Sequence, residues 1–161
     1  MTPEEFAAKA DVSQETLKQL IEYKNILEKW QLRINLISTG TLPEFWRRHI
    51  DDSAQLLPLL PTGRKAILYD LGSGAGFPGL VLAILAKNLE THLVESDTRK
   101  AAFLGEAARA TGVARHVTIH ATRIEKLPRA RLPAADVVVS RALAPLTQLL
   151  RSEEHTSELQ S

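Results

Sequence analysis

The sequence contains no cysteine, so it can form neither a disulfide framework nor a thiolate metal site. It also lacks a long apolar run, because the longest, residues 79–86, is far shorter than the roughly 20 residues that span a bilayer. The first eleven residues carry acids where a secretory signal would carry positive charge. These absences predict a soluble, cytoplasmic protein that binds no membrane and no metal ion.

The composition is otherwise that of an ordinary globular protein. Of the 161 residues 44% are hydrophobic, and 20 Lys and Arg stand against 19 Asp and Glu. A chain of this length can bury one core, and so low a net charge gives no strongly basic patch. We therefore expect one core rather than two full domains.

The end of the chain differs from the rest. Residues 151–161 read RSEEHTSELQS, a polar string that interrupts a helical pattern and has no hydrophobic period of its own. Back-translated in one way, this string resembles the adapter that is ligated to DNA libraries for short-read sequencing. We therefore expect residues 151–161 to be a non-native, adapter-derived tail that takes no part in the fold.

Residues 1–64 read as an N-terminal helical cap. Capping boxes at Thr2–Glu5 and Thr41–Glu44, and a capping serine at Ser13, predict where three helices begin, the last of them running to about residue 57. The second helix carries one apolar stripe, made of Leu20, Tyr23, Leu27, Trp30 and Ile34. This stripe must pack against the remainder of the protein.

Residues 65–150 change to short apolar strands that alternate with helices. The predicted strands are Ala66–Leu71, Thr91–Glu95, Val117–Ala121 and Asp136–Ser140, and the predicted helices are Pro78–Lys87 and Thr98–Thr111. Such alternation is typical of an α/β, Rossmann-like domain with parallel strands and helices on both faces.

A glycine-rich loop follows the first strand. It reads DLGSGAGFPG from Asp70, and its glycines at 72, 74 and 76 permit a positive φ and let a ligand approach the backbone. In a doubly wound fold ligands bind beyond the carboxyl ends of the strands, where this loop lies. We therefore predict a ligand site that includes Gly72 and Gly74.

Two acidic residues narrow the choice of ligand. Asp70, two residues before the first glycine, would repel a pyrophosphate but suits a ligand with an ammonium group, such as S-adenosylmethionine. Glu95 ends the second strand, where a carboxylate can accept hydrogen bonds from ribose hydroxyls. A ribose is present in NAD as well, so an NAD-dependent oxidoreductase stays open as the alternative.

Two further segments lie where they can reach the same site. Arg123, Ile124 and Glu125 follow the third strand, where they could flank an adenine ring, with Ile124 packing on it. Arg141 follows the fourth strand, and the pattern leaves open whether it binds a substrate phosphate, contacts the cofactor or forms a structural salt bridge.

The motifs together resemble those of the bacterial 16S ribosomal RNA guanine-N7 methyltransferases, also called glucose-inhibited division protein B. The run DLGSGAGFPGLVLAI, the pair ES at 95, RIE at 123 and SRALAPL from 140 carry this resemblance, with Trp30 and the RHI..DS pattern of residues 48–53. The resemblance covers about residues 15–150.

The resemblance implies a class I methyltransferase that uses S-adenosylmethionine to methylate N7 of one guanine in 16S ribosomal RNA. It implies a monomer whose partner is this RNA or the small ribosomal subunit. It also implies cofactor contacts by five residues: Gly72, Phe77, Ile124, Glu125 and Arg141. A sheet of this class has seven strands, so the last strands are missing here, and an inactive methyltransferase fragment is a further alternative.

No catalytic base is predicted. N7 of guanine carries an in-plane lone pair, so methylation requires no removal of a proton, and positioning supplies the catalysis. His49 is interpreted as a structural residue, and Trp30 and Trp46 as links between cap and sheet.

Overall fold

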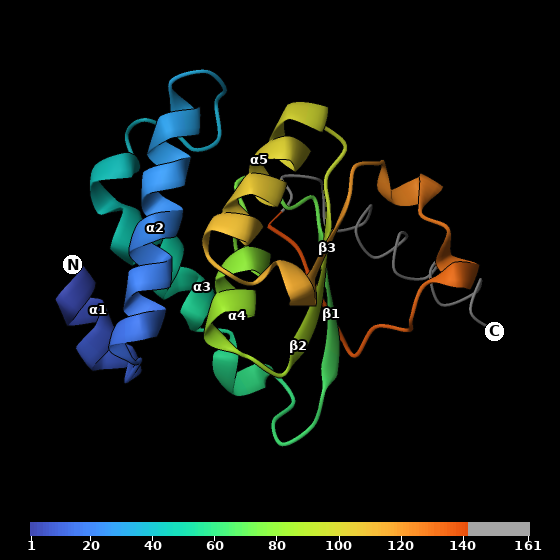
Figure 1. Ribbon diagram of the computed structural model, residues 1–161, viewed down its shortest axis with the longest axis horizontal. Coiled ribbons are helices and arrows are strands. Elements are labelled where there is room, and N and C mark those ends of the chain that lie inside the picture. The colour runs from blue at the N-terminus through green and yellow to red at the C-terminus, as the bar shows by residue number, and fades with distance from the viewer. Residues whose placement is uncertain (142–161) are drawn as a thin grey trace.

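A computed structural model of the chain describes residues 1–141 (Figure 1). The cap begins with helices α1 (Pro3–Ala10) and α2 (Gln14–Gln31). The predicted capping box of α1 is confirmed, because Thr2 Oγ1 accepts from the Glu5 amide at 3.1 Å and Glu5 Oε2 accepts from the Thr2 amide at 2.7 Å. Ser13 caps α2 as predicted, through its Oγ and the Thr16 amide, 3.1 Å apart.

The apolar stripe of α2 faces the protein interior. Leu20, Tyr23 and Leu27 are fully buried, and Trp30 is half-buried with its Nε1 donating to Glu106 Oε2 at 2.7 Å. Trp30 therefore links α2 to α5 (Thr98–Ala110), as expected of a tryptophan that joins the cap to the sheet. Trp46 is buried as well.

The prediction of one helix over residues 41–57 is wrong. This stretch instead forms the 3-10 helix η1 (Leu42–Glu44), the π-helix η2 (Trp46–Asp51), the single turn α3 (Asp52–Ala54) and the 3-10 helix η3 (Leu57–Leu59). Thr41 does not cap η1 with its side chain. Its hydroxyl donates to the Ser38 carbonyl at 2.8 Å and lies 3.0 Å from His49 Nε2, so these partners take the groups that a capping box would need.

The described residues form a parallel sheet in the order β3-β2-β1-β4, which confirms the predicted Rossmann-like arrangement. The strands are β1 (Ala66–Leu71), β2 (Leu89–Val94), β3 (Val117–His120) and β4 (Val137–Val139). Each lies within two residues of its predicted bounds. The first strand is central, pairing with β2 on one side and β4 on the other.

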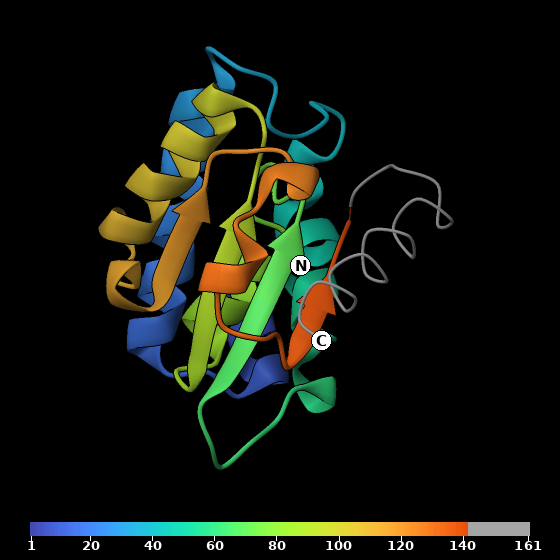
Figure 2. The same ribbon diagram turned by 90° about the vertical axis from the view of Figure 1, so that its right-hand side faces the viewer.

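The two faces of the sheet are covered differently. Helices α4 (Gly79–Leu85), α5 and α2 gather on one face (Figure 1). In residues 1–141, the other face is crossed by the connection from β3 to β4, which contains the short 3-10 helices η5 (Ile124–Lys126) and η6 (Arg129–Arg131) (Figure 2). A further 3-10 helix, η4 (Ala114–His116), precedes β3. The second face thus carries 3-10 turns in this part of the chain where α-helices were expected.

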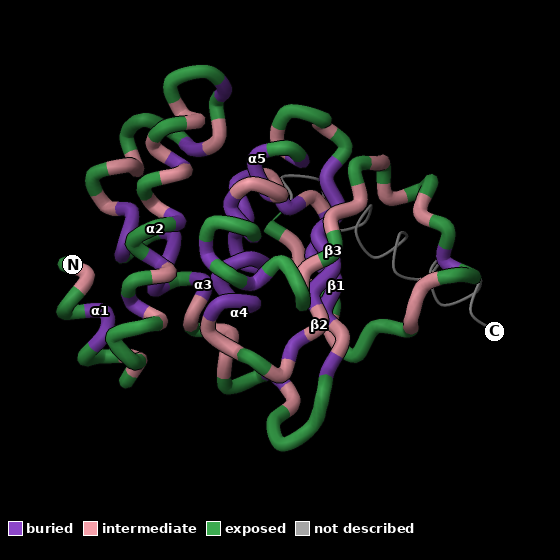
Figure 3. The backbone as a smooth tube through the Cα atoms, in the orientation of Figure 1, coloured by how far each residue is buried: buried purple, intermediate pink, exposed green. Residues whose placement is uncertain are grey.

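Buried residues concentrate between the sheet and the helices that pack on it (Figure 3). One apolar cluster combines Phe6, Leu20 and Tyr23 of the cap with Leu80 of α4 and Leu93 of β2. Because cap and sheet share this cluster, the cap packs as part of one core. The division of the chain at residue 64 into a helical cap and a Rossmann-like domain stays a prediction.

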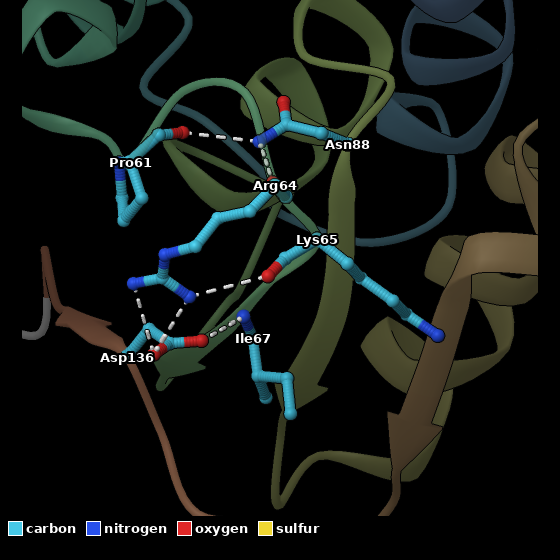
Figure 4. Close-up of polar contacts among 6 residues, drawn as sticks. All are labelled: Pro61, Arg64, Lys65, Ile67, Asn88 and Asp136. Carbon is cyan, nitrogen blue, oxygen red and sulfur yellow. Dashed lines mark hydrogen bonds and ion pairs between the residues drawn. The ribbon is translucent and has the colours of Figure 1, made fainter.

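A polar clip fixes the start of β4 beside β1 (Figure 4). Asp136 Oδ2 accepts from the Ile67 amide at 2.8 Å, and its Oδ1 pairs with Arg64 at 3.3 Å. Asn88 Nδ2 donates to the carbonyls of Pro61 and Arg64, which ties the turn before β1 to the turn before β2. These contacts fix β4 and β2 in register with β1, and the register determines where the carboxyl ends of the strands lie.

None of the helices in residues 1–141 is long and apolar enough to cross a membrane. The predictions for residues 142–150 and for the tail, 151–161, lie outside the described residues.

Candidate functional site

The glycine loop between β1 and α4 builds the site. Gly72, Gly74 and Gly76 have φ of 81°, 53° and 95°, a region that residues with a Cβ rarely adopt. The amides of Gly72 and Ser73 both donate to the Val94 carbonyl at 2.9 Å, so the loop turns across the end of β2. The chain adds β2 and β3 on one side of β1 and then β4 on the other side. The glycine loop, which follows β1, therefore begins at the point where the strand order reverses.

A pocket of about 310 Å³ opens at the carboxyl ends of the strands. Its lining brings together three of the predicted cofactor residues, Gly72, Ile124 and Glu125. Val94, Ser96, Thr122 and Arg123 complete the lining. Sequence reasoning missed Ser96 and Thr122, although each follows a predicted strand directly or closely.

Asp70 lies beneath the loop and is fully buried. Its Oδ2 accepts from the Gly79 amide at 2.9 Å, and its Oδ1 has no hydrogen-bond partner among residues 1–141. Burial raises the pKa of Asp70 to about 7, against the opposing hydrogen bond from the Gly79 amide. A Cβ at position 79 would lie 2.5 Å from Oδ2, so only glycine lets the amino end of α4 approach this carboxyl group.

Glu95 ties the glycine loop to the end of β2. Its Oε1 accepts from the Gly74 amide at 2.8 Å, and its Oε2 accepts from the Asp97 amide at 2.8 Å. The residue is 8% exposed. The two amides therefore fix the carboxylate, and each oxygen keeps one further lone pair for the ribose that the sequence predicted there.

Phe77 and Arg141 lie together in a second part of the site. The guanidinium carbon of Arg141 is 5.9 Å from the centre of the Phe77 ring, and the His49 ring stacks on Phe77 at 4.7 Å. Arg141 also pairs with Asp52 at 3.3 Å. It lines two pockets of about 570 and 370 Å³, both of which border the cap.

Tyr23 supports the loop from below and was predicted only as a core residue. Its hydroxyl donates to the Ala75 carbonyl and lies 2.5 Å from where a Cβ of Gly76 would stand. Burial raises the pKa of Tyr23 well above its usual value. A buried tyrosine in an apolar stripe needs a partner for its hydroxyl, so the sequence signals that Tyr23 makes a polar contact but not with which group.

Among residues 1–141 there is no group of three His, Cys, Asp or Glu side chains that could hold a metal ion. The lining of the pocket offers an organic ligand one acidic residue, Glu125, and two apolar residues, Val94 and Ile124.

Comparison with known proteins shows the family. The sequence matches the family described as rRNA small subunit methyltransferase G (GidB) over residues 16–159. It is 57% identical over 150 residues to ribosomal RNA small subunit methyltransferase G of Rhodospirillum rubrum, covering 93% of this chain and 71% of that protein. The protein of the same name from Parvibaculum lavamentivorans is 52% identical over 149 residues, with coverages of 91% and 64%. The chain thus spans about two thirds of the length of these relatives.

Solved structures with a similar fold are more distant in sequence. A precorrin-6y C5,15-methyltransferase from Geobacter metallireducens superposes with a TM-score of 0.54 at 17% identity, covering 76% of this chain and 58% of that one. The structure of MtNAS in complex with MTA and tNA gives 0.56 at 16% identity, with coverages of 86% and 50%. These likenesses agree with the Rossmann-like fold, and the sequence matches establish the relationship: the chain belongs to the rRNA small subunit methyltransferase G family.

Proposed function

We propose that the protein transfers a methyl group from S-adenosylmethionine to N7 of a guanine in 16S ribosomal RNA. The observation that carries this proposal is the pocket at the carboxyl ends of the strands, where Gly72, Ile124 and Glu125 meet. Membership of a methyltransferase family favours this activity over an NAD-dependent oxidoreductase. We place its action in the cytoplasm, as a monomer, on the RNA or on the small subunit.

The residues present fit S-adenosylmethionine. Ile124 gives the pocket an apolar wall for an adenine ring, and Glu95 gives the loop a fixed carboxylate for ribose hydroxyls. The buried Oδ1 of Asp70 lacks a hydrogen-bond donor among residues 1–141, and an ammonium group at the loop would supply one. When bound, S-adenosylmethionine supplies the electrophilic methyl group.

The chain needs no general base for this reaction. N7 of guanine presents a lone pair and no proton, so the protein has to orient the two reactants and exclude water. Burial is the main reason that the pKa of His49 is lowered to about 4, and its Nε2 is engaged with Thr41. Both observations support the interpretation of His49 as a non-catalytic residue, which was expected from the sequence.

Calorimetric titration of S-adenosylmethionine and NAD into the full chain tests the proposal. We expect binding of S-adenosylmethionine alone, and a severalfold loss of affinity in Ile124→Ala, because the apolar wall is removed. Lys126→Ala is the matched control, since Lys126 lies in the same 3-10 turn without lining the pocket. Binding of NAD in preference, or equal affinity in Ile124→Ala and the wild type, would overturn the proposal.

A further inference from the structure

The Arg48–Ser53 segment carries part of the family resemblance, yet it lies outside the pocket proposed for the cofactor. It belongs to the π-helix η2 and the turn α3. π-Helical turns are rare and occur frequently at functional sites. The segment meets the rest of the site at Arg141, two residues beyond the end of β4, and at Phe77 of the glycine loop.

Three groups of this segment contact the same guanidinium. Nη1 of Arg141 lies 3.4 Å from His49 Nδ1. Nη2 donates to the Arg48 carbonyl at 3.3 Å and pairs with Asp52 Oδ2 at 3.3 Å. Phe77 of the glycine loop lies beneath the guanidinium, and His49 stacks on the same ring. Arg141 is thereby held between the cap and the loop.

The hydrogen bonds around His49 specify which nitrogen carries its proton. The Thr41 hydroxyl donates to the Ser38 carbonyl at 2.8 Å, so its oxygen is left to accept from His49 Nε2, 3.0 Å away. The proton of neutral His49 then lies on Nε2, and the Nδ1 lone pair faces Arg141. A chain of four groups, from Ser38 to Arg141, is satisfied only by this tautomer.

We propose that the Arg48–Ser53 segment positions Arg141 for the cofactor, with His49 as a positioning residue that acts through Arg141. The proposal rests on the function proposed above, because it takes Arg141 as a residue of the cofactor site. Its physical basis is the entropy of the arginine side chain, which is lost before the ligand arrives if the segment already holds the guanidinium.

Charges around His49 agree with a neutral ring. Burial lowers the pKa of His49 to about 4, Arg141 and Arg48 lower it further, and Asp52 opposes them. Above about pH 5 the Nδ1 lone pair therefore stays available to Arg141.

The test is the affinity of the full chain for S-adenosylmethionine, measured by calorimetry in His49 variants. His49→Phe keeps a ring over Phe77 and removes both nitrogens, and we expect a loss of about tenfold, the usual worth of a hydrogen bond to a charged group. His49→Asn restores an acceptor near the position of Nδ1 and should recover part of the loss. Thr41→Val, which no longer fixes the tautomer, should lose less than His49→Phe while leaving the core intact.

Lys24→Met is the matched control for stability. It removes the ion pair between Lys24 and Glu28 within α2 of the cap, and neither residue belongs to the Arg48–Ser53 segment. Its affinity should equal that of the wild type. If His49→Phe and Thr41→Val also bind like the wild type, the inference is wrong and the proposed function stands.

The double variant His49→Phe/Arg141→Ala tests whether His49 acts through Arg141. We expect it to bind no worse than Arg141→Ala alone, because the positioned group is already gone. Losses that multiply would show that His49 acts independently, which overturns the inference. Failure of the wild type to bind S-adenosylmethionine would overturn the proposed function and this inference with it.

Discussion

Replacing Asp70 with asparagine should raise stability at high pH and weaken the cofactor site in the same protein. Asp70 is fully buried, its Oδ2 accepts from the Gly79 amide, and its Oδ1 has no partner among the described residues. Above its pKa the fold must therefore keep a charge out of water with the Gly79 amide as the opposing hydrogen-bond donor. Asparagine keeps an acceptor for Gly79 and removes the charge.

The magnitude follows from the pKa. In the folded protein the pKa of Asp70 is about 7, against 3.8 in the unfolded chain, mainly because of burial. The folded state holds the proton more tightly, so the stability that Asp70 contributes at low pH is lost as the pH rises from about 4 to about 7. Between pH 5 and pH 8 this loss amounts to about 2.6 kcal/mol, using about 1.4 kcal/mol per pKa unit.

Urea unfolding of the wild type and Asp70→Asn at pH 5 and pH 8 measures this term as a difference. We expect the variant to gain about 2.6 kcal/mol on the wild type between the two pH values, since other titrating groups cancel. The same variant should bind S-adenosylmethionine more weakly at pH 8, because an amide attracts an ammonium group less than a carboxylate does. A difference in stability that does not change with pH would refute the reasoning about the buried carboxyl group.

Three further predictions concern the loop, the second face of the sheet and the clip at β4. Gly76→Ala should lower the free energy of unfolding by about 2 kcal/mol or more, because φ is 95° and the new Cβ would lie 2.5 Å from the Tyr23 hydroxyl. Gly74→Ala is the matched comparison, since φ is 53° there and the new Cβ meets open space, and it should cost about 1 kcal/mol. Thermal unfolding of both variants measures the difference. His92 Nδ1 and His120 Nε2 lie 2.9 Å apart, and burial lowers the pKa of both residues. Their contribution to stability is therefore present above pH 6.5 and lost as the pH falls. This pH dependence of the free energy of unfolding should shrink in His120→Gln. Asp136→Ala should speed hydrogen exchange at the Ile67 amide, which loses its acceptor, and an unchanged rate would contradict the role given to this clip.

The regular elements were predictable because their signals are local. Ser13 and the stripe of Leu20, Tyr23 and Leu27 define α2, and the apolar runs define the four strands to within two residues. The stretch after Thr41 was not predictable in the same way. Its capping pattern is present in the sequence, but the Thr41 hydroxyl is committed to Ser38 and His49, which only the tertiary structure reveals.

The candidate site divides in the same manner. The glycine loop and the ends of the strands could be predicted from spacing, and the structure brings Gly72, Ile124 and Glu125 to one pocket. The contact between Tyr23 and Ala75 joins residues 52 positions apart, and that between His49 and Arg141 joins residues 92 apart. Periodicity in the sequence shows that such residues are buried, but it cannot show which distant group they meet.

An assay of methyl transfer to ribosomal RNA is the direct test of the proposed function. The full chain is incubated with S-adenosylmethionine labelled in its methyl group and with unmethylated 16S ribosomal RNA, free or in small subunits, and labelled 7-methylguanine is mapped by chemical cleavage of the RNA. We expect label at N7 of one guanine, and less of it with Ile124→Ala than with Lys126→Ala. Absence of label in the RNA from a chain that binds both reactants, or label on an atom other than N7, would contradict the proposed function.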